Sequence, residues 1–352
     1  MNMKTVCYGE HESVHFYSDE SVGLFAIIAV HTTFSGCSLG GCRIKSFSSE
    51  KEAIQEVLRL SEHMTYKSLL CDLKMGGGKS VIVAGPNFKK TPQLLKSFAN
   101  AVNSLGGQYI VSVDMGSDSD DMEFIKQTTD YVIGYDQNKG GAGDPGVYTA
   151  RGVLAGMKTA LQEKWSTSSF KDRKICVVGI GDVGRPLCQS LLEEGARLIV
   201  SDVDKKQIDW VKQFGEVEVV EPRKAHQVPC DIFSPCATGD VFTVENVKEL
   251  NCQVIAGAAN NQLVSEEVGK VLFQRDILYL PDFAVNAGGL VGVVLGGIRK
   301  ENLEETLKKV DDIEELTRDI LQRSEKEKKP TSQVALEMAR KKYNIMYSKT
   351  RL

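Results

Sequence analysis

A buried strand that runs into a glycine-rich turn narrows the possible folds of this chain more than any other segment. The apolar run 175–178 leads into Gly179-Ile180-Gly181-Asp182-Val183-Gly184, and a helix is expected from about residue 183. A second predicted strand ends in Ser201-Asp202, eighteen residues after Gly184. In such a unit the turn amides can bind a pyrophosphate and the aspartate can accept from a ribose 2′-hydroxyl. The spacing predicts an NAD site, because Asp202 would repel the 2′-phosphate of NADP; a helix cap is the alternative for Asp202.

Strands and helices alternate through the rest of this half. The apolar patterns predict strands at 174–179, 197–201, 217–220, 231–234, 253–257 and 277–280, and helices at 148–163, 183–194, 205–214, 243–250 and 265–274. This order indicates a parallel sheet with right-handed crossovers, as in a Rossmann-type domain over 147–329. A long amphipathic helix is predicted at 301–323, and after Pro330 a last helix runs to about residue 346.

Two lysines mark the second informative stretch, which lies in the first half of the chain. Lys67 and Lys79 bracket a segment that ends in Gly76-Gly77-Gly78-Lys79-Ser80, just before the apolar run 81–83. Glycines at the mouth of a strand would let a small ligand approach the backbone closely. A phosphate-binding loop is disfavoured, because Leu73 occupies the position of its first glycine and a strand follows. A bulged strand with a surface lysine is the structural alternative.

Asp114 ends another predicted strand, 109–113, and is well placed there for acid/base chemistry, although a turn or cap is equally compatible. Further strands are expected at 23–31 and 80–84. Helices are expected at 50–63, with Ser48 or Ser49 as cap, and at 92–104. These segments predict an α/β domain over 1–146, with the glycine-rich stretch 137–147 as a hinge.

Composition limits the possible partners. The net charge of -4 gives no reason to expect nucleic acid or an anionic membrane as a partner, and no apolar run approaches the roughly 18–20 residues of a transmembrane helix. The nine cysteines include no Cys-x-x-Cys pair, so we expect reduced thiols in a cytoplasmic protein and no metal site.

Together these segments resemble the Glu/Leu/Phe/Val family of amino-acid dehydrogenases, in particular its leucine, phenylalanine and tryptophan dehydrogenase branch. The resemblance runs from about Gly23 to about Val310. It is carried by Leu39-Gly40-Gly41, Met64-Thr65-Tyr66-Lys67, Gly76-Gly77-Gly78-Lys79, Asp114, the turn 179–184, Pro235-Cys236-Ala237, Gly257-Ala258-Ala259-Asn260-Asn261-Gln262-Leu263 and Pro281-Asp282-Phe283-Ala284-Val285-Asn286-Ala287-Gly288-Gly289.

The resemblance implies an N-terminal α/β substrate domain, a Rossmann-type NAD-binding domain, a cleft between them, and a C-terminal helix, about 330–352, that returns to the first domain. It implies that Lys67 binds the substrate α-carboxylate, that Lys79 and Asp114 are catalytic, and that Leu39, Gly40 and Asn286 contact the substrate. The implied cofactor residues are Thr149, Gly179, Gly181, Asp182, Val183, Gly184, Asp202, Cys236, Ala237, Ala258, Asn260 and Asn286. Such proteins form homo-oligomers, from dimers to octamers, and act on amino acids as small-molecule substrates.

Departures from the family pattern leave the substrate open. Gly36-Cys37-Ser38 replaces the usual Gly-Pro-Ala, and Gly292, Val294 and Leu295 replace the usual asparagine and acidic residues. Oxidative deamination of a branched-chain amino acid is our first expectation, and of an aromatic one our second. The alternatives are a degenerate, non-catalytic homologue that senses a dinucleotide or amino acid, and a two-domain NAD enzyme acting on a folate or hydroxy acid. A hydroxy-acid enzyme is disfavoured because no catalytic histidine lies beside the glycine turn.

Overall fold

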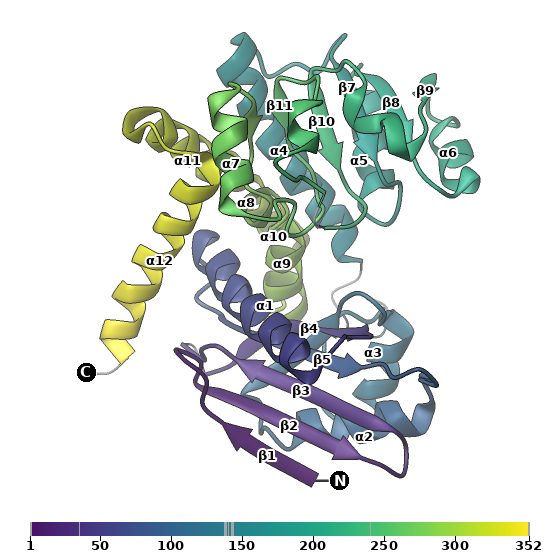
Figure 1. Cartoon of the computed structure of the whole chain (residues 1–352), viewed down its shortest axis with the longest axis vertical. Helices are drawn as coiled ribbons and strands as arrows, with labels where there is room; N and C mark the ends of the chain where they lie inside the picture. The colour runs from purple at the N-terminus through teal and green to yellow at the C-terminus, as the bar shows by residue number, and fades with distance from the viewer. Residues whose placement is uncertain are drawn as a thin grey trace. The chain divides into compact units, whose positions relative to one another are not determined.

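The computed structural model describes residues 2–34, 36–136, 139, 141, 144–239 and 241–350 (Figure 1). The chain divides by its contacts into two compact units. The first contains Met1–Asp144, Val293–Lys300 and Ala339–Leu352, and the second contains Pro145–Gly292 and Glu301–Met338. Residues 293–300 therefore group with the first unit, whereas the sequence placed them in the second domain. Five of the eleven residues of the predicted hinge at 137–147 lie outside the described residues, and its last three belong to a helix that begins at Pro145.

The first unit is built on a six-stranded mixed sheet with the order β1-β2-β3-β5-β4-β6. Its strands are β1 (Asn2–Val6), β2 (Ser13–Asp19), β3 (Leu24–Val30), β4 (Ser38–Lys45), β5 (Gly76–Val83) and β6 (Tyr109–Val113). β4 runs parallel to both β5 and β6, while the pairs from β1 to β5 are antiparallel. β4 therefore lies between β5, which carries Lys79, and β6, which Asp114 directly follows.

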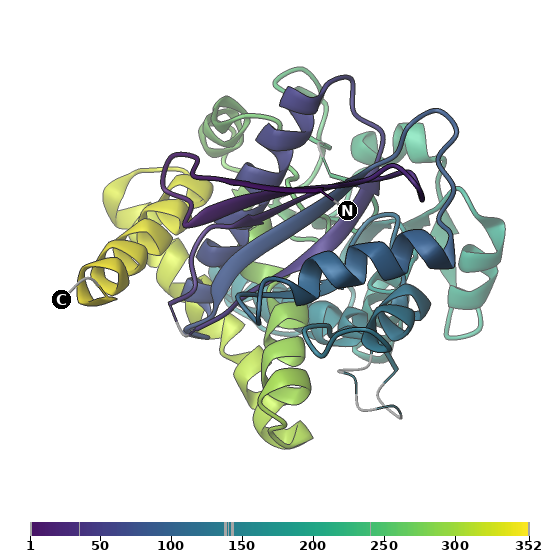
Figure 2. The same ribbon diagram turned by 90° about the horizontal axis from the view of Figure 1, so that it is seen from below.

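Helices cover both faces of this sheet (Figure 2). On β3, Ile28 and its same-face neighbours pack in the cluster that contains α2 (Pro92–Asn103), whereas Ile27 and Ala29 pack with α1 (Glu50–Leu70). Because successive residues of a strand point to opposite faces, burial on both sides explains why the sequence there reads as one continuous apolar run. A third helix, α3 (Ser119–Lys126), begins in a capping box formed by Asp118 and Asp121.

Helix α1 is longer than the predicted 50–63. Its start is as expected, since the Ser49 side chain accepts a hydrogen bond from the Glu52 amide. Its end lies at Leu70, because Thr65, Tyr66 and Leu69 continue the buried face that began at Ala53. Lys67 thus lies inside the last turn of the helix.

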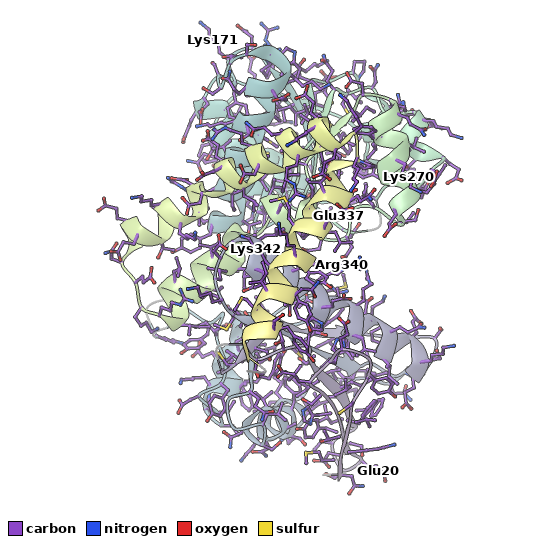
Figure 3. All side chains as sticks on the ribbon, turned by 90° about the vertical axis from the view of Figure 1, so that its left-hand side faces the viewer. Glu20, Lys171, Lys270, Glu337, Arg340 and Lys342 are labelled. Atoms are coloured by element: carbon purple, nitrogen blue, oxygen red, sulfur yellow. The ribbon has the colours of Figure 1, made fainter. Side chains whose placement is uncertain are left out.

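The C-terminal helix α12 (Thr331–Thr350) contributes residues from Ala339 onward to the first unit. Lys342, labelled with Arg340 in Figure 3, forms an ion pair of 2.7 Å with Asp72. The next residue, Tyr343, stacks on His31, with 5.2 Å between the ring centroids. Burial lowers the pKa of His31 to about 3, so this ring is neutral at physiological pH. Residues 293–298 of the same unit form the π-helix η4 (Val293–Ile298).

The second unit is built on a fully parallel six-stranded sheet with the order β12-β11-β10-β7-β8-β9. Counted from its first strand in the chain, this is the doubly wound order 3-2-1-4-5-6 of dinucleotide-binding folds. The strands are β7 (Lys174–Val178), β8 (Arg197–Ser201), β9 (Val217–Val219), β10 (Ile232–Pro235), β11 (Val254–Ile255) and β12 (Leu278–Tyr279). The α/β prediction with a parallel Rossmann-type sheet is confirmed.

Helices and short turns surround this sheet. They are α4 (Pro145–Trp165), α5 (Gly184–Glu193), α6 (Lys205–Val211), η2 (Pro222–Gln227), η3 (Asn246–Lys248), α7 (Glu266–Gln274), α8 (Asp282–Val285), α9 (Gly288–Gly292), α10 (Leu303–Asp311) and α11 (Ile313–Glu327). The core on one face includes Cys176 and Ile199 from the strands and Val268 and Leu272 from α7.

Two helix predictions in this unit were wrong. The segment 243–250 contains only the 3-10 turn η3, because Thr243 and Asn246 hydrogen-bond each other's backbone amides and so compete with helical bonding. The predicted single helix 301–323 is two helices that meet at Asp312. Its expected continuous apolar stripe is also interrupted, since Leu303 is 60% exposed.

Candidate functional site

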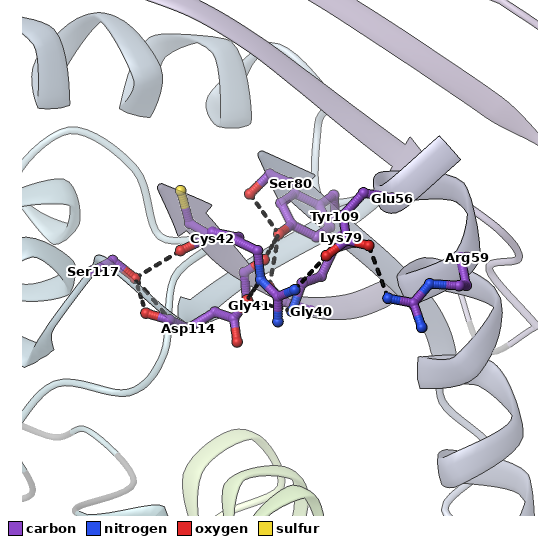
Figure 4. Close-up of polar contacts among 11 residues, drawn as sticks. Gly40, Gly41, Cys42, Glu56, Arg59, Lys79, Ser80, Tyr109, Asp114 and Ser117 are labelled. Atoms are coloured by element: carbon purple, nitrogen blue, oxygen red, sulfur yellow. Dashed lines mark hydrogen bonds and ion pairs between the residues drawn. The ribbon is translucent and has the colours of Figure 1, made fainter. Parts of the chain in front are cut away.

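A buried ion pair joins the two residues predicted to be catalytic. Lys79 Nζ lies 2.9 Å from Asp114 Oδ2, and the Lys79 residue is only 6% exposed (Figure 4). Lys79 pairs with Ala29 on β3, and β4 and β5 keep the same register before and after this position, so β5 has no extra residue here. Because Lys79 is also buried, the alternative of a bulged strand with a surface lysine is wrong. The Asp114 amide donates to Ser117 Oγ, which itself donates to the Cys42 carbonyl and fixes the loop after β6.

The register of three strands explains why these side chains meet. Cys42 on β4 pairs with Ser80 on β5 and with Val113 on β6. Lys79 directly precedes Ser80 and Asp114 directly follows Val113, so both lie next to this row of paired residues. Between them lies Gly41, where an added Cβ would be 2.6 Å from Asp114 Cβ. The glycine therefore leaves the space across β4 through which the lysine and the carboxylate approach each other.

The triple glycine belongs to β5 and does not precede it. At Gly77 an added Cβ would lie 2.2 Å from the Thr65 amide nitrogen of α1, and at Gly78 it would lie 2.6 Å from the Tyr109 ring. The Gly77 amide also donates to Thr65 Oγ1 at 3.0 Å. The expectation that these glycines admit a ligand is wrong, because the protein's own helix and ring fill the space.

An arginine that the sequence analysis missed completes the charged site. Arg43 Nε lies 2.8 Å from Asp114 Oδ2, and Arg43 Nη1 lies 2.5 Å from Glu56 Oε1 on α1. Arg43 is 9% exposed. A charged residue between the apolar Cys42 and Ile44 was the available signal, since a buried arginine is almost always paired.

The charges around Asp114 determine its protonation. Burial alone would raise the pKa of the Asp114 carboxyl, but Lys79 and Arg43 together lower it well below its ordinary value. The carboxylate is therefore ionised throughout the physiological pH range while both cations remain in contact.

Three of the four predicted substrate residues lie in the same unit as Lys79 and Asp114, whereas the fourth, Asn286, belongs to the second unit. Lys67 is half-buried in the last turn of α1, two residues after Thr65, where the helix touches β5. Leu39 is 2% exposed on β4, and an added Cβ at its neighbour Gly40 would lie 1.7 Å from the Gly78 carbonyl oxygen. The substrate-binding roles of Lys67, Leu39 and Gly40 stay predictions.

The glycine turn in the second unit joins the carboxyl end of β7 to α5. Gly179 has a φ of +96°, and an added Cβ at Gly184 would lie 2.1 Å from the Gly179 carbonyl oxygen. At Gly181, by contrast, nothing lies within 4 Å of an added Cβ. Asp182 is exposed beside it, and Val183 precedes the first residue of α5. Such a turn holds its shape through the outer glycines and leaves room for a pyrophosphate at the middle one.

Asp202 directly follows β8 and reaches this turn. Its Oδ2 accepts from the Ile180 amide at 2.6 Å, and its Oδ1 accepts from the Asp204 amide at 2.8 Å. The cap of α6 is Asp204, which accepts from the Lys206 amide, so the helix-cap reading of Asp202 is wrong. Asp202 lies beside the dinucleotide turn, as expected from its spacing.

The remaining predicted cofactor residues follow the carboxyl ends of the strands. Cys236 and Ala237 follow β10, the parallel neighbour of β7, and an added Cβ at Gly179 would lie 2.6 Å from the Ala237 amide nitrogen. Ligands of open parallel sheets bind at such a switch point, where neighbouring strands are connected in opposite directions. Thr149 lies in the first turn of α4 and packs against Gly289.

Asn286 brings the ends of β11 and β12 together. Its Nδ2 donates to the Ala258 carbonyl at 3.1 Å and to Asn260 Oδ1 at 2.8 Å. Asn286 is 5% exposed, yet its Oδ1 has no hydrogen-bond partner among the described residues. A buried acceptor without a partner is costly, and the carboxamide of a nicotinamide ring carries a donor that would satisfy it. The open position at Gly181 and this acceptor both fit a nicotinamide dinucleotide.

Other ligand types find less support. In the described part of the chain, no group of three or more His, Cys, Asp or Glu residues is arranged to bind a metal ion. No described helix is long and apolar enough to cross a membrane.

Comparisons with known proteins give concordant results. A family model described as Glu/Leu/Phe/Val dehydrogenase, dimerisation domain, matches residues 11–131, and one described as Glutamate/Leucine/Phenylalanine/Valine dehydrogenase matches residues 198–346. A leucine dehydrogenase of Thermoactinomyces intermedius is 38% identical, over 96% of this chain and 92% of that protein. A phenylalanine dehydrogenase of Caldalkalibacillus thermarum is 39% identical, over 95% of this chain and 92% of that protein. The crystal structure of L-tryptophan dehydrogenase from Nostoc punctiforme superimposes with a TM-score of 0.81 at 34% identity, covering 96% of this chain and 97% of that one.

Proposed function

Because the chain belongs to the Glu/Leu/Phe/Val dehydrogenase family and is an amino-acid dehydrogenase, we propose that it catalyses the reversible, NAD-dependent oxidative deamination of an apolar L-amino acid to its 2-oxo acid and ammonia. The observation that carries this proposal is the buried ion pair of Lys79 and Asp114. A sheet interior holds a lysine and a carboxylate at a cost in free energy, and their pairing across β4, with Lys79 inside β5 and Asp114 directly after β6, supports a chemical role.

In this proposal, different residues of the first unit bind the substrate and transfer its protons. Lys67 pairs with the α-carboxylate and orients Cα. Loss of hydride from Cα leaves an iminium, which water attacks. Lys79 orients that water and stabilises the oxygen of the resulting carbinolamine, and Asp114 exchanges protons with the nitrogen until ammonia leaves.

The second unit provides the hydride acceptor. Nicotinamide dinucleotide, when bound, accepts the hydride at C4 of its ring. The turn 179–184 would hold the pyrophosphate, with Cys236 and Ala237 beside it. Asn286, Asn260, Ala258 and Thr149 would surround the nicotinamide end. Asp202 supports NAD over NADP, because its carboxylate would repel a 2′-phosphate.

We infer a branched-chain amino acid as the first choice of substrate and an aromatic one as the second. The similarity to both leucine and phenylalanine dehydrogenases supports this range. A homo-oligomer, from dimer to octamer, is supported by the match to a family model named for a dimerisation domain. All nine cysteines are free thiols, which favours a reducing compartment such as the cytoplasm.

A direct test follows NADH absorbance after mixing the protein with NAD and single L-amino acids at alkaline pH. We expect turnover with leucine, valine and isoleucine to exceed that with phenylalanine and tryptophan, and none with glutamate. Each D-enantiomer is the matched control, and NADP replaces NAD in a parallel series. Calorimetric binding of NAD or an amino acid without any NADH formation would instead support the non-catalytic sensor.

A further inference from the structure

Two cations converge on the same oxygen of Asp114. Lys79 Nζ and Arg43 Nε lie 2.9 Å and 2.8 Å from Asp114 Oδ2, which is the oxygen of the closest contact in both ion pairs. Both of these contacts are therefore made to the same side of the carboxylate. Its second oxygen, Oδ1, makes neither of them.

The arginine is the rigid member of this arrangement. Its Nη1 is bound to Glu56 Oε1, and the other oxygen of Glu56 accepts from Arg59 Nη2 at 2.8 Å (Figure 4). Arg43 is thereby held at both ends of its planar fork, and a guanidinium does not lose its proton in proteins. It cannot take part in proton transfer, but it can fix the orientation of the group that does.

On this basis, and resting on the function proposed above, we propose that Arg43, anchored by Glu56, is a positioning residue for Asp114. It holds Oδ2 next to Lys79 and turns Oδ1 toward the amino group of the substrate. It also supplies a permanent positive charge, so that the carboxylate stays ionised when the Lys79 ammonium moves to the reacting water.

The other titratable groups near Asp114 do not replace this charge. Burial raises the pKa of Cys42, on β4, to about 12 and raises that of Tyr109, on β6, well above its ordinary value. Both groups are therefore neutral at working pH. Asp121, on α3, is paired with Lys90. The charges that act on the carboxylate are those of Lys79 and Arg43, with Glu56 behind the arginine.

The test compares four variants of the full chain by the pH dependence of kcat/KM and by kcat and KM at the optimum. Arg43→Gln removes the positive charge and the planar guanidinium. We expect kcat to fall at least about tenfold because Asp114 loses its orientation. The acidic limb of the kcat/KM profile should shift to higher pH by about one unit, because the buried Asp114 carboxyl loses a cation. Arg43→Lys keeps the charge but cannot reach both carboxylates. It should keep the acidic limb in place while kcat falls.

Glu56→Gln leaves the charge next to Asp114 and removes the anchor, so a smaller loss of kcat without a shift of the limb is expected. The matched control is Arg59→Gln, which changes the partly exposed partner of Glu56 and should leave both the limb and kcat within about twofold of wild type. A merely structural role would lower the melting temperature of the variants without moving the limb.

The inference is overturned if Arg43→Gln, shown to be folded by circular dichroism, keeps the wild-type pH profile and kcat. If that variant does not fold, Glu56→Gln decides: unchanged kcat contradicts the anchoring role. These outcomes are distinct from failure of the proposed function, in which the wild-type protein itself forms no NADH with any amino acid.

Discussion

The two glycine-rich segments of this protein look alike in sequence and do opposite things. In Gly76-Gly77-Gly78 the missing side chains make room for the protein itself, since α1 and the Tyr109 ring occupy the positions where Cβ atoms would lie. In the turn 179–184 the outer glycines are similarly enclosed, but Gly181 faces open space. Glycine leaves space beside the backbone in both places. The chain itself fills this space in the first segment, whereas it stays open at Gly181, where we propose that the cofactor binds.

The polar groups of the two regions differ in the same way. Those next to the first segment are satisfied internally, through the ion pairs of Lys79, Asp114 and Arg43. In the second unit, Asn286 keeps a buried oxygen without a partner among the described residues. A closed charged cluster is suited to proton chemistry, and an open turn with an unfilled acceptor is suited to holding a cofactor.

The largest expected effect is on kcat, and it comes from a substitution at Lys79 in the first unit that should spare NAD binding by the second. Replacing Lys79 with alanine should lower kcat about 10²- to 10⁴-fold, the usual cost of losing a general acid or base. NAD binding should stay nearly unchanged, because the cofactor residues belong to the second unit. Steady-state kinetics and fluorescence titration with NADH measure the two quantities. The exposed Lys51 provides the control alanine variant, and a Lys79→Ala protein with near wild-type kcat would contradict the assignment.

Lys67 tests whether the first region also binds the substrate. If it pairs with the α-carboxylate, Lys67→Ala should lose about 2–5 kcal/mol of binding to every amino acid, whatever its side chain. KM should rise strongly and kcat should fall as Cα loses its orientation. Kinetics with leucine, valine and phenylalanine check this. Values of KM within twofold of wild type for all three would show that Lys67 serves only the end of α1, where a lysine stabilises the helix by less than about 1 kcal/mol.

A pair of glycine substitutions addresses the contrast directly. Gly77→Ala should destabilise the fold by about 1–3 kcal/mol, because its Cβ would meet the Thr65 amide nitrogen at 2.2 Å and α1 must shift. Gly181→Ala should leave the free energy of unfolding close to that of wild type and weaken NAD binding instead. Chemical denaturation gives the free energy of unfolding of each variant, and titration with NADH gives its affinity for the cofactor. An equal loss of stability in both variants would contradict the distinction between an enclosed Gly77 and an open Gly181.

The smallest effect is expected at Asp202. Asp202→Asn keeps an oxygen that can accept from the Ile180 amide and removes the negative charge, so the turn should retain its shape. We expect the preference for NAD over NADP to narrow, mainly through a lower KM for NADP. Kinetics with both cofactors at fixed ionic strength provide the measurement. A wild-type preference for NADP would refute the role given to Asp202.

The sequence alone determined the class of fold and the position of the glycine turn at which we propose that the cofactor binds. Local patterns sufficed there, because the strand 174–178, the turn 179–184, the helix after it and Asp202 form one contiguous βαβ unit whose spacing is set by backbone geometry. Asp114 follows a strongly apolar strand, as expected, whereas Lys79 was expected just before a strand and instead lies inside β5. The end of α1 and the break at Asp312 were missed, because tertiary burial and not local periodicity sets them.

Only the tertiary structure decided how distant residues combine. Asp114 is 71 residues from Arg43 in the chain, and it meets Arg43 and Glu56 because β4 lies beside β6 and α1 supplies Glu56. The filled space at Gly77 and the open space at Gly181 are likewise invisible in a list of residues. A sequence specifies which groups are present and their local backbone, whereas the balance between internal pairing and room for a ligand depends on which segments fold against them.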